Sequence, residues 1–63
     1  MTPTERIRKI YGHGAVQRFA RAMGVRPGTI SGWQDEWPQY ALTVLEWLEE
    51  TPEKYWPDRW QRQ

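Results

Sequence analysis

The segment from Val16 to Asp35, VQRFARAMGVRPGTISGWQD, constrains the fold of this chain more than any other part of the sequence. Two short helices that meet at a steep angle need a small residue where they cross, which Ala20 supplies, and a residue tolerant of positive φ in the turn, which Gly24 supplies. Large or β-branched residues must follow the turn, so that their side chains can pack the second helix against the first. The pattern therefore predicts a helix-turn-helix over about residues 16–35, with an inward-facing core of Phe19, Ala20, Met23, Gly24, Val25, Ile30 and Trp33.

Helix signals flank this segment on its N-terminal side. Thr2-Pro3-Thr4-Glu5 has the form of a capping box with proline in the first turn, so a helix is expected to begin there and to end at Gly12. The first helix of the helix-turn-helix is expected over about Gly14 to Met23. Its second helix is expected over residues 27–36, because it must end before Pro38.

A further helix is predicted over residues 39–50, and it is apolar on two adjoining strips. Ala41, Leu45 and Leu48 form the strip expected to face the core. The other strip, together with the aromatic tail of residues 51–63, offers more apolar surface than one small core can cover. The tail is expected to form a short helical turn and a loosely helical end, which either folds back over the first helix or contacts another molecule. A homodimer interface is the favoured use of Tyr40, Val44, Trp47, Tyr55, Trp56 and Trp60.

Length limits what such a chain can do. A chain of 63 residues buries only ~60% of its unfolded surface, so it cannot also enclose a deep substrate pocket. The sequence has no cysteine, one histidine (His13) and one serine (Ser31), and the carboxylates of Glu49, Glu50 and Glu53 are typical of a solvated helix end. We therefore expect a single all-α domain over residues 1–63 that is not an enzyme, with no cofactor, metal, small-molecule substrate or membrane segment.

Charge is divided unevenly along the chain. Residues 1–32 hold six arginines and lysines against one glutamate, a net charge of +5, whereas residues 33–63 hold three against seven acidic residues, a net charge of −4. Such a division favours one face that meets a polyanion and a second face that does not. The alternative is a solvated surface on which the charges cluster by accident.

The segment Val16 to Asp35 resembles the helix-turn-helix of the Cro and lambda-repressor-like regulators of phages and prophages, and the resemblance covers about residues 4–50. It implies a compact fold of four or five helices whose third helix enters the major groove. It also implies a transcriptional repressor that binds an operator in double-stranded DNA as a homodimer, in the cytoplasm of a bacterial host.

Residue roles follow from this resemblance. Arg26 stands where the family commonly has a serine or threonine cap, so the third helix lacks a side-chain cap. A DNA phosphate could instead accept hydrogen bonds from the free N–H groups at the start of this helix. Pro27, Gly28 and Gly32 stand where relatives often carry glutamine or asparagine, which favours close backbone approach to the bases over direct readout. The expected contacts to bases or the groove are Arg26, Pro27, Gly28, Thr29, Ser31 and Gly32.

Phosphate contacts are expected from the basic and polar residues of the first two helices. Helical rotation places Gln17, Arg18 and Arg21 on one broad face. Arg6 or Arg8 and the loop residue His13 are further candidates, although a solvated role is an equal alternative for the arginines of the first helix. Two other functions stay open: a phage-encoded inhibitor or adaptor that binds a host protein through its acidic, tryptophan-rich half, and a small excision or architectural factor that bends DNA.

Overall fold

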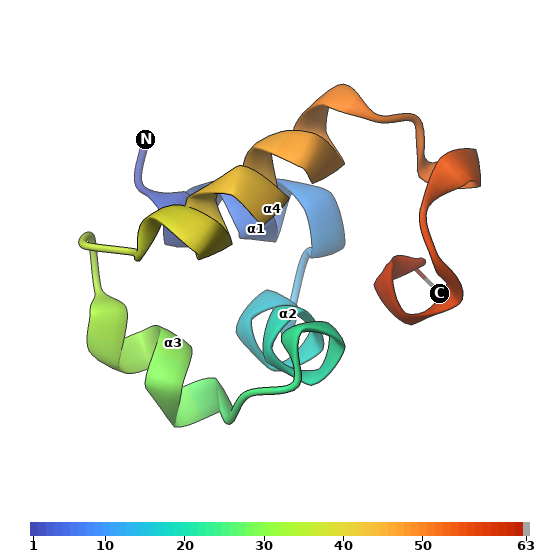
Figure 1. The fold of residues 1–63 in the computed structure, drawn as a ribbon. Coiled ribbons are helices and arrows are strands. Elements are labelled where there is room, and N and C mark those ends of the chain that lie inside the picture. The colour runs from blue at the N-terminus through green and yellow to red at the C-terminus, as the bar shows by residue number, and fades with distance from the viewer. Residues whose placement is uncertain (63) are drawn as a thin grey trace.

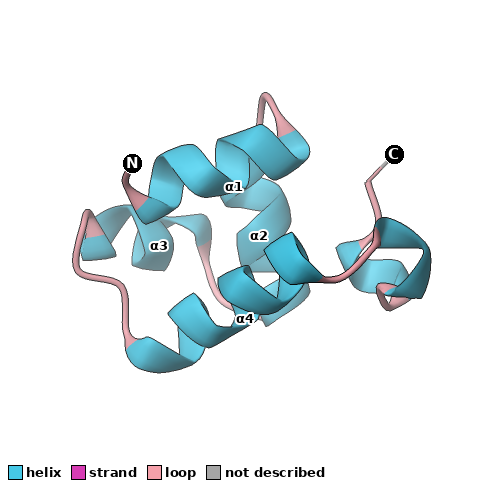
Figure 2. Ribbon diagram, turned by 90° about the horizontal axis from the view of Figure 1, so that it is seen from above, coloured by secondary structure: helices cyan, strands magenta, loops and turns pink. Residues whose placement is uncertain are grey.

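The computed structural model describes residues 1–62, which form four α-helices, two short 3₁₀ helices and no strand. The elements are α1 (Pro3–Tyr11), α2 (Ala15–Met23), α3 (Pro27–Trp33), α4 (Gln39–Glu50), η1 (Glu53–Tyr55) and η2 (Asp58–Trp60). In Figure 1, α1 and α4 lie together above α2, and Figure 2 shows α3 on one side of α2 and the C-terminal tail on the other. None of the helices described is long and apolar enough to cross a bilayer.

The start and end of α1 confirm the predicted capping box. The Thr2 hydroxyl oxygen accepts a hydrogen bond from the Glu5 backbone N–H at 3.2 Å, and Glu5 Oε1 accepts one from the Thr2 backbone N–H at 2.9 Å. Both bonds satisfy N–H groups that would otherwise face water at the helix start. The helix ends at Gly12, whose φ is +73°.

Gly24 forms the turn between α2 and α3, as the sequence predicts. Its φ is +81°, its N–H donates to the Arg21 carbonyl oxygen at 3.2 Å, and the Val25 N–H donates to the Ala20 carbonyl oxygen at 3.0 Å. This pair of bonds is the Schellman arrangement, which closes a helix end and requires a left-handed residue. Only three residues, Gly24, Val25 and Arg26, separate the end of α2 from the start of α3.

The predicted end of α3 is wrong by three residues, because the helix stops at Trp33 and not at residue 36. Gln34 adopts a φ of +53°, which the helical ladder cannot continue. The chain turns there and carries Trp37 into the core, where its ring lies 5.2 Å from that of Phe19. Trp37 is buried, and among residues 1–62 its indole N–H has no hydrogen-bond partner.

The core forms around α2, and it contains most of the residues predicted for it. Phe19, Ala20 and Ile30 are buried, while Met23, Val25 and Trp33 are partly buried and pack against the core. Gly24 lies at the surface, so its contribution is conformational. The predicted inner strip of α4 is buried in full, and α1 adds one fully buried side chain; these residues are Ile7, Ala41, Leu45 and Leu48.

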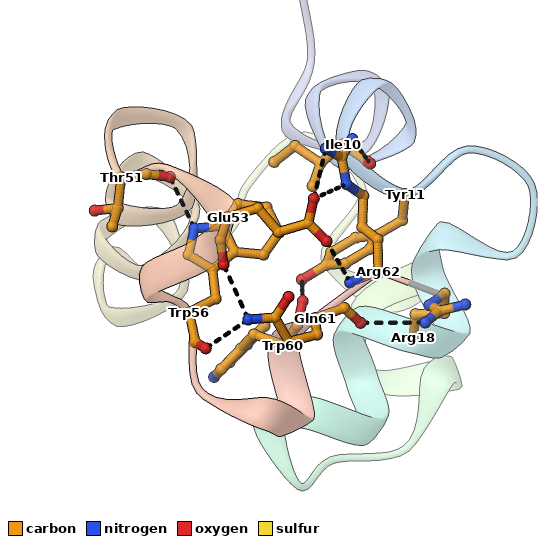
Figure 3. A network of polar contacts seen from close by, with 9 residues as sticks. All are labelled: Ile10, Tyr11, Arg18, Thr51, Glu53, Trp56, Trp60, Gln61 and Arg62. Carbon is orange, nitrogen blue, oxygen red and sulfur yellow. Dashed lines mark hydrogen bonds and ion pairs between the residues drawn. The ribbon is translucent and has the colours of Figure 1, made fainter.

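The tail folds back onto the helices, which corrects part of the predicted dimer interface. Trp56 and Trp60 are 7% and 6% exposed, so both belong to the core of one chain and are not available to a second copy. Backbone and side-chain hydrogen bonds fix the tail (Figure 3): the Tyr11 hydroxyl donates to the Trp60 carbonyl oxygen at 2.8 Å, and Trp56 Nε1 donates to the Thr51 carbonyl oxygen at 2.8 Å. Gln61 Nε2 donates to the carbonyl oxygens of Glu53 and Trp56.

Candidate nucleic-acid interface

The outward face of α3 and the turn before it are open to solvent. All the residues expected to contact bases or the groove are exposed, namely Arg26, Pro27, Gly28, Thr29, Ser31 and Gly32. The opposite face of α3 holds Ile30 in the core. All six residues are therefore accessible, although helical rotation points the side chains of Pro27 and Thr29 about 160° apart around α3.

Gly28 and Gly32 have no structural reason to be glycine. Neither has a positive φ, and a Cβ atom built on either would meet no other atom within 4 Å. Glycine inside a helix costs about 0.5–1 kcal/mol relative to alanine, so two of them weaken a seven-residue helix with no return in packing. They leave the exposed face of α3 nearly free of side-chain bulk.

Arg26 is the residue at which α3 begins, and it provides no side-chain cap, as predicted. Its backbone is extended, with φ −79° and ψ 146°, and its carbonyl oxygen accepts a hydrogen bond from the Thr29 N–H at 2.9 Å. The side chain is exposed and forms no ion pair within residues 1–62. Its guanidinium group is therefore free to contact a ligand.

The three α2 residues expected to contact phosphate do share one patch. Gln17, Arg18 and Arg21 line a hollow of about 450 Å³ together with Tyr11, Asp58, Arg59 and Gln61. Gln17 and Arg21 are exposed, whereas Arg18 is half-buried. We call this site the arginine hollow.

Arg18 is held in place by the tail. Its guanidinium donates to the Gln61 carbonyl oxygen at 3.3 Å and lies 5.8 Å from the centre of the Tyr11 ring (Figure 3). Burial raises the pKa of Tyr11 to about 12, so its hydroxyl stays protonated and keeps donating to the Trp60 carbonyl oxygen. One side chain of the patch is thus positioned before any ligand arrives.

The other candidate phosphate contacts divide into two groups. His13 and Arg8 are exposed and line a second hollow of about 660 Å³ with Gln17, next to the arginine hollow. Arg6 lies elsewhere, since its guanidinium forms a two-bond ion pair with Glu49 of α4, with Nε and Oε2 3.0 Å apart. Because this pair engages Arg6 within the chain, the expectation that it contacts phosphate is not supported by its position.

Arg59 is a residue of the patch that the sequence did not single out. It lies in η2, far from α2 along the chain, and lines the arginine hollow only because the tail folds back. The available signal was the pair of tryptophans around it, Trp56 and Trp60, whose burial brings η2 against α2.

The rest of the expected dimer surface remains exposed on α4. Tyr40 and Trp47 are 58% and 42% exposed, and Val44 between them is half-buried. Val44 and Trp47 line a largely apolar hollow of about 340 Å³ with Met23 of α2 and with Arg59 and Trp60 of η2. Tyr55 is also exposed, but it lies on η1 and not on α4, and Lys54 Nζ lies 5.2 Å from the centre of its ring.

Across the described part of the chain, no three histidine, aspartate or glutamate side chains come together as metal ligands would. Comparisons with protein-family models, with curated protein sequences and with solved structures find no match to the chain.

Proposed function

We propose that this protein is a sequence-specific regulator of transcription that binds double-stranded DNA through a helix-turn-helix formed by α2 and α3, as in the Cro and lambda-repressor-like proteins that its sequence resembles. The observation that carries the proposal is the outward face of α3. That face is fully accessible, and its two glycines lack a reason within the fold.

The DNA major groove is about 12 Å wide and admits one α-helix. The shape and the polar groups of the outward face of α3 suit such a groove. Without side chains at Gly28 and Gly32, the helix backbone can approach the base edges closely. Thr29 and Ser31 then supply hydroxyl groups, and Arg26 supplies the guanidinium that commonly pairs with guanine. Close approach with few long side chains favours recognition by shape and by thymine methyl groups over extensive hydrogen bonding.

The arginine hollow supplies the sequence-independent part of the binding energy. Gln17, Arg18 and Arg21 would contact backbone phosphates and set the position of α3 in the groove. The acidic residues Glu46, Glu49 and Glu50 lie on α4, which lies above α2 in Figure 1. A duplex that approaches α2 and α3 would be separated from these three carboxylates, whereas the exposed Asp35 and Glu36 lie just after α3.

A homodimer fits the exposed strip of α4, Tyr40, Val44 and Trp47. Two copies joined there would place two α3 helices on one duplex, with half-sites about 34 Å apart if the dimer is symmetric. The same strip favours a second candidate function, binding of a different protein through α4. In that case the chain would bind no duplex with sequence preference.

The test is equilibrium binding to labelled duplexes that tile the DNA around the gene, with scrambled duplexes of equal length as controls. We expect one duplex to bind at least about 10³-fold more tightly than the scrambled ones. If each protomer neutralises about three phosphates, the slope of log K against log salt is about −5 for a dimer. Equal binding to every duplex, or binding that does not depend on salt, would exclude the proposal.

Arg26→Ala separates base contact from phosphate contact in the same assay. We expect the variant to lose more affinity for the preferred duplex than for the scrambled ones, by about 1–3 kcal/mol. Lys54→Ala removes the same charge from the tail, outside the α2–α3 surface, and serves as the matched control. Equal losses of Arg26→Ala on all duplexes would make Arg26 a phosphate contact only.

A further inference from the structure

The arginine hollow joins two parts of the chain that lie more than thirty residues apart. Arg18 and Arg21 come from α2, and Arg59 comes from η2. The only carboxylate in the lining is that of Asp58, so the side chains of the hollow carry a net charge of +2. None of its arginines forms an ion pair within the described residues.

The hollow is built on a rigid frame. Trp60 is buried against Phe19, with the ring centres 5.3 Å apart, and this anchors η2 against α2. The Tyr11 hydroxyl holds the Trp60 carbonyl oxygen, and the Gln61 carbonyl oxygen holds Arg18. The backbone directly after Arg59 is therefore held in place, and the exposed side chain of Arg59 is the part that has to be ordered when a ligand binds.

Three arginines line the hollow without forming an ion pair in the described residues, and guanidinium groups match the oxygens of a phosphate. A guanidinium offers five N–H donors in a planar fork, and Arg18 uses one of these bonds internally. Gln17 adds an uncharged amide donor at the same site. A single phosphodiester group could thus be bound by charge and by several hydrogen bonds together.

The place of the hollow in the fold indicates where that phosphate would come from. The tail lies on the side of α2 opposite to α3 (Figures 1 and 2). Packed helices are about 8–10 Å apart, and the major groove is about 12 Å wide. Half of the groove width is about 6 Å, so when α3 occupies the groove, a site on the far side of α2 lies outside it, where it could contact only the phosphate backbone and no base edge.

We infer that the C-terminal tail is part of the DNA interface, and that Arg59, beside Arg18 and Arg21, binds a backbone phosphate of its own next to the groove that holds α3. This inference rests on the proposed function, and it assigns to Arg59 a contact independent of base sequence.

The experiment compares Arg59→Ala with Lys54→Ala, which removes an equal charge from an exposed tail position outside the hollow. Affinity and salt slope are measured on the preferred and a scrambled duplex. Each neutralised phosphate contributes a slope of about −0.9, so Arg59→Ala should weaken binding to both duplexes about fivefold per protomer at 0.15 M salt. Its slope should be less steep by about 1 per protomer, while Lys54→Ala leaves the slope unchanged.

Two further variants distinguish phosphate contact from a change in folding. Arg59→Lys keeps the charge and should keep the wild-type slope while losing part of the affinity, because lysine lacks the planar fork. Asp58→Asn removes the carboxylate from the hollow and should tighten binding to both duplexes. The circular dichroism melting curve of each variant should match that of the wild type, since both side chains are exposed.

The outcomes separate this inference from the proposed function. If the wild type binds its duplex and Arg59→Ala binds with the same affinity and slope, the tail contact is wrong and the proposed function stands. The phosphate bound in the hollow could also come from free phosphate and not from DNA. Titration of the wild type with inorganic phosphate, followed by the NMR signals of the arginine Nε–H groups, tests this alternative. Phosphate binding at Arg59 without binding of any duplex would overturn both the DNA contact and the proposed function.

Discussion

At Gly28 and Gly32, the stability of the fold and the proposed contact with DNA have opposite requirements. Alanine would suit α3 better at both positions, because φ is not positive and the space above each residue is empty. A DNA backbone or base edge would fill that same space. Substitution at these positions therefore tests function and stability in one protein, with changes of opposite sign.

Gly28→Ala and Gly32→Ala should each stabilise the fold by about 0.5–1 kcal/mol. For a domain of this size the melting temperature rises by about 2–8 °C. Each variant should nevertheless bind the preferred duplex about tenfold or more weakly, because the methyl group holds the helix away from the bases. Melting curves and duplex titrations of the same preparations measure both effects. A more stable variant with wild-type affinity would show that the glycines are not in contact with DNA.

Between elements, the ion pair of Arg6 and Glu49 joins α1 to α4. Hydrogen bonds from Arg6 hold the pKa of Glu49 below its ordinary value of 4.5. The unfolded chain therefore binds more protons in acid than the folded chain does. The stability that this pair contributes is present above pH 4.5 and is lost as pH falls through the lower, folded-state pKa.

Glu49→Gln should lower the melting temperature at pH 7 by a few degrees, since an exposed pair contributes about 1 kcal/mol or less. The variant should lose less stability than the wild type between pH 5 and pH 3. Some acid dependence should remain, because hydrogen bonds from Thr2 and Arg62 lower the pKa values of Glu5 and Glu53. Glu50→Gln is the control, since Glu50 forms no ion pair within residues 1–62. Parallel pH profiles for Glu49→Gln and the wild type would contradict the assignment.

Local signals were sufficient to predict some elements and not others. The capping box at Thr2 and the apolar period of residues 39–50 predicted α1 and α4 at their observed bounds. The end of α3 depends on Gln34 and on the burial of Trp37 against Phe19, a contact across the core that no local pattern encodes. The burial of Trp56 and Trp60, and with it the position of Arg59, depends in the same way on the path of the whole tail.

For the whole molecule, the exposed strip of α4 predicts a second copy as its partner. Trp47→Glu places a charge within the proposed contact, on a side chain that is 42% exposed in one chain. We expect the wild type to sediment as a dimer and this variant as a folded monomer, with at least about 100-fold weaker binding to a duplex that carries two half-sites. Tyr55→Ser removes an exposed aromatic ring outside the strip and should change neither property. A wild type that stays monomeric at the highest soluble concentration would exclude the α4 dimer.

The return of the tail to α2 has a consequence for the order in which the core is completed during synthesis. Phe19, in the middle of α2, is covered on one side by Trp60, which the ribosome adds some forty residues later. A nascent chain released after α4 would therefore present an incomplete apolar surface to chaperones and proteases. We therefore expect a fragment that ends before Trp60 to be degraded faster than the full chain.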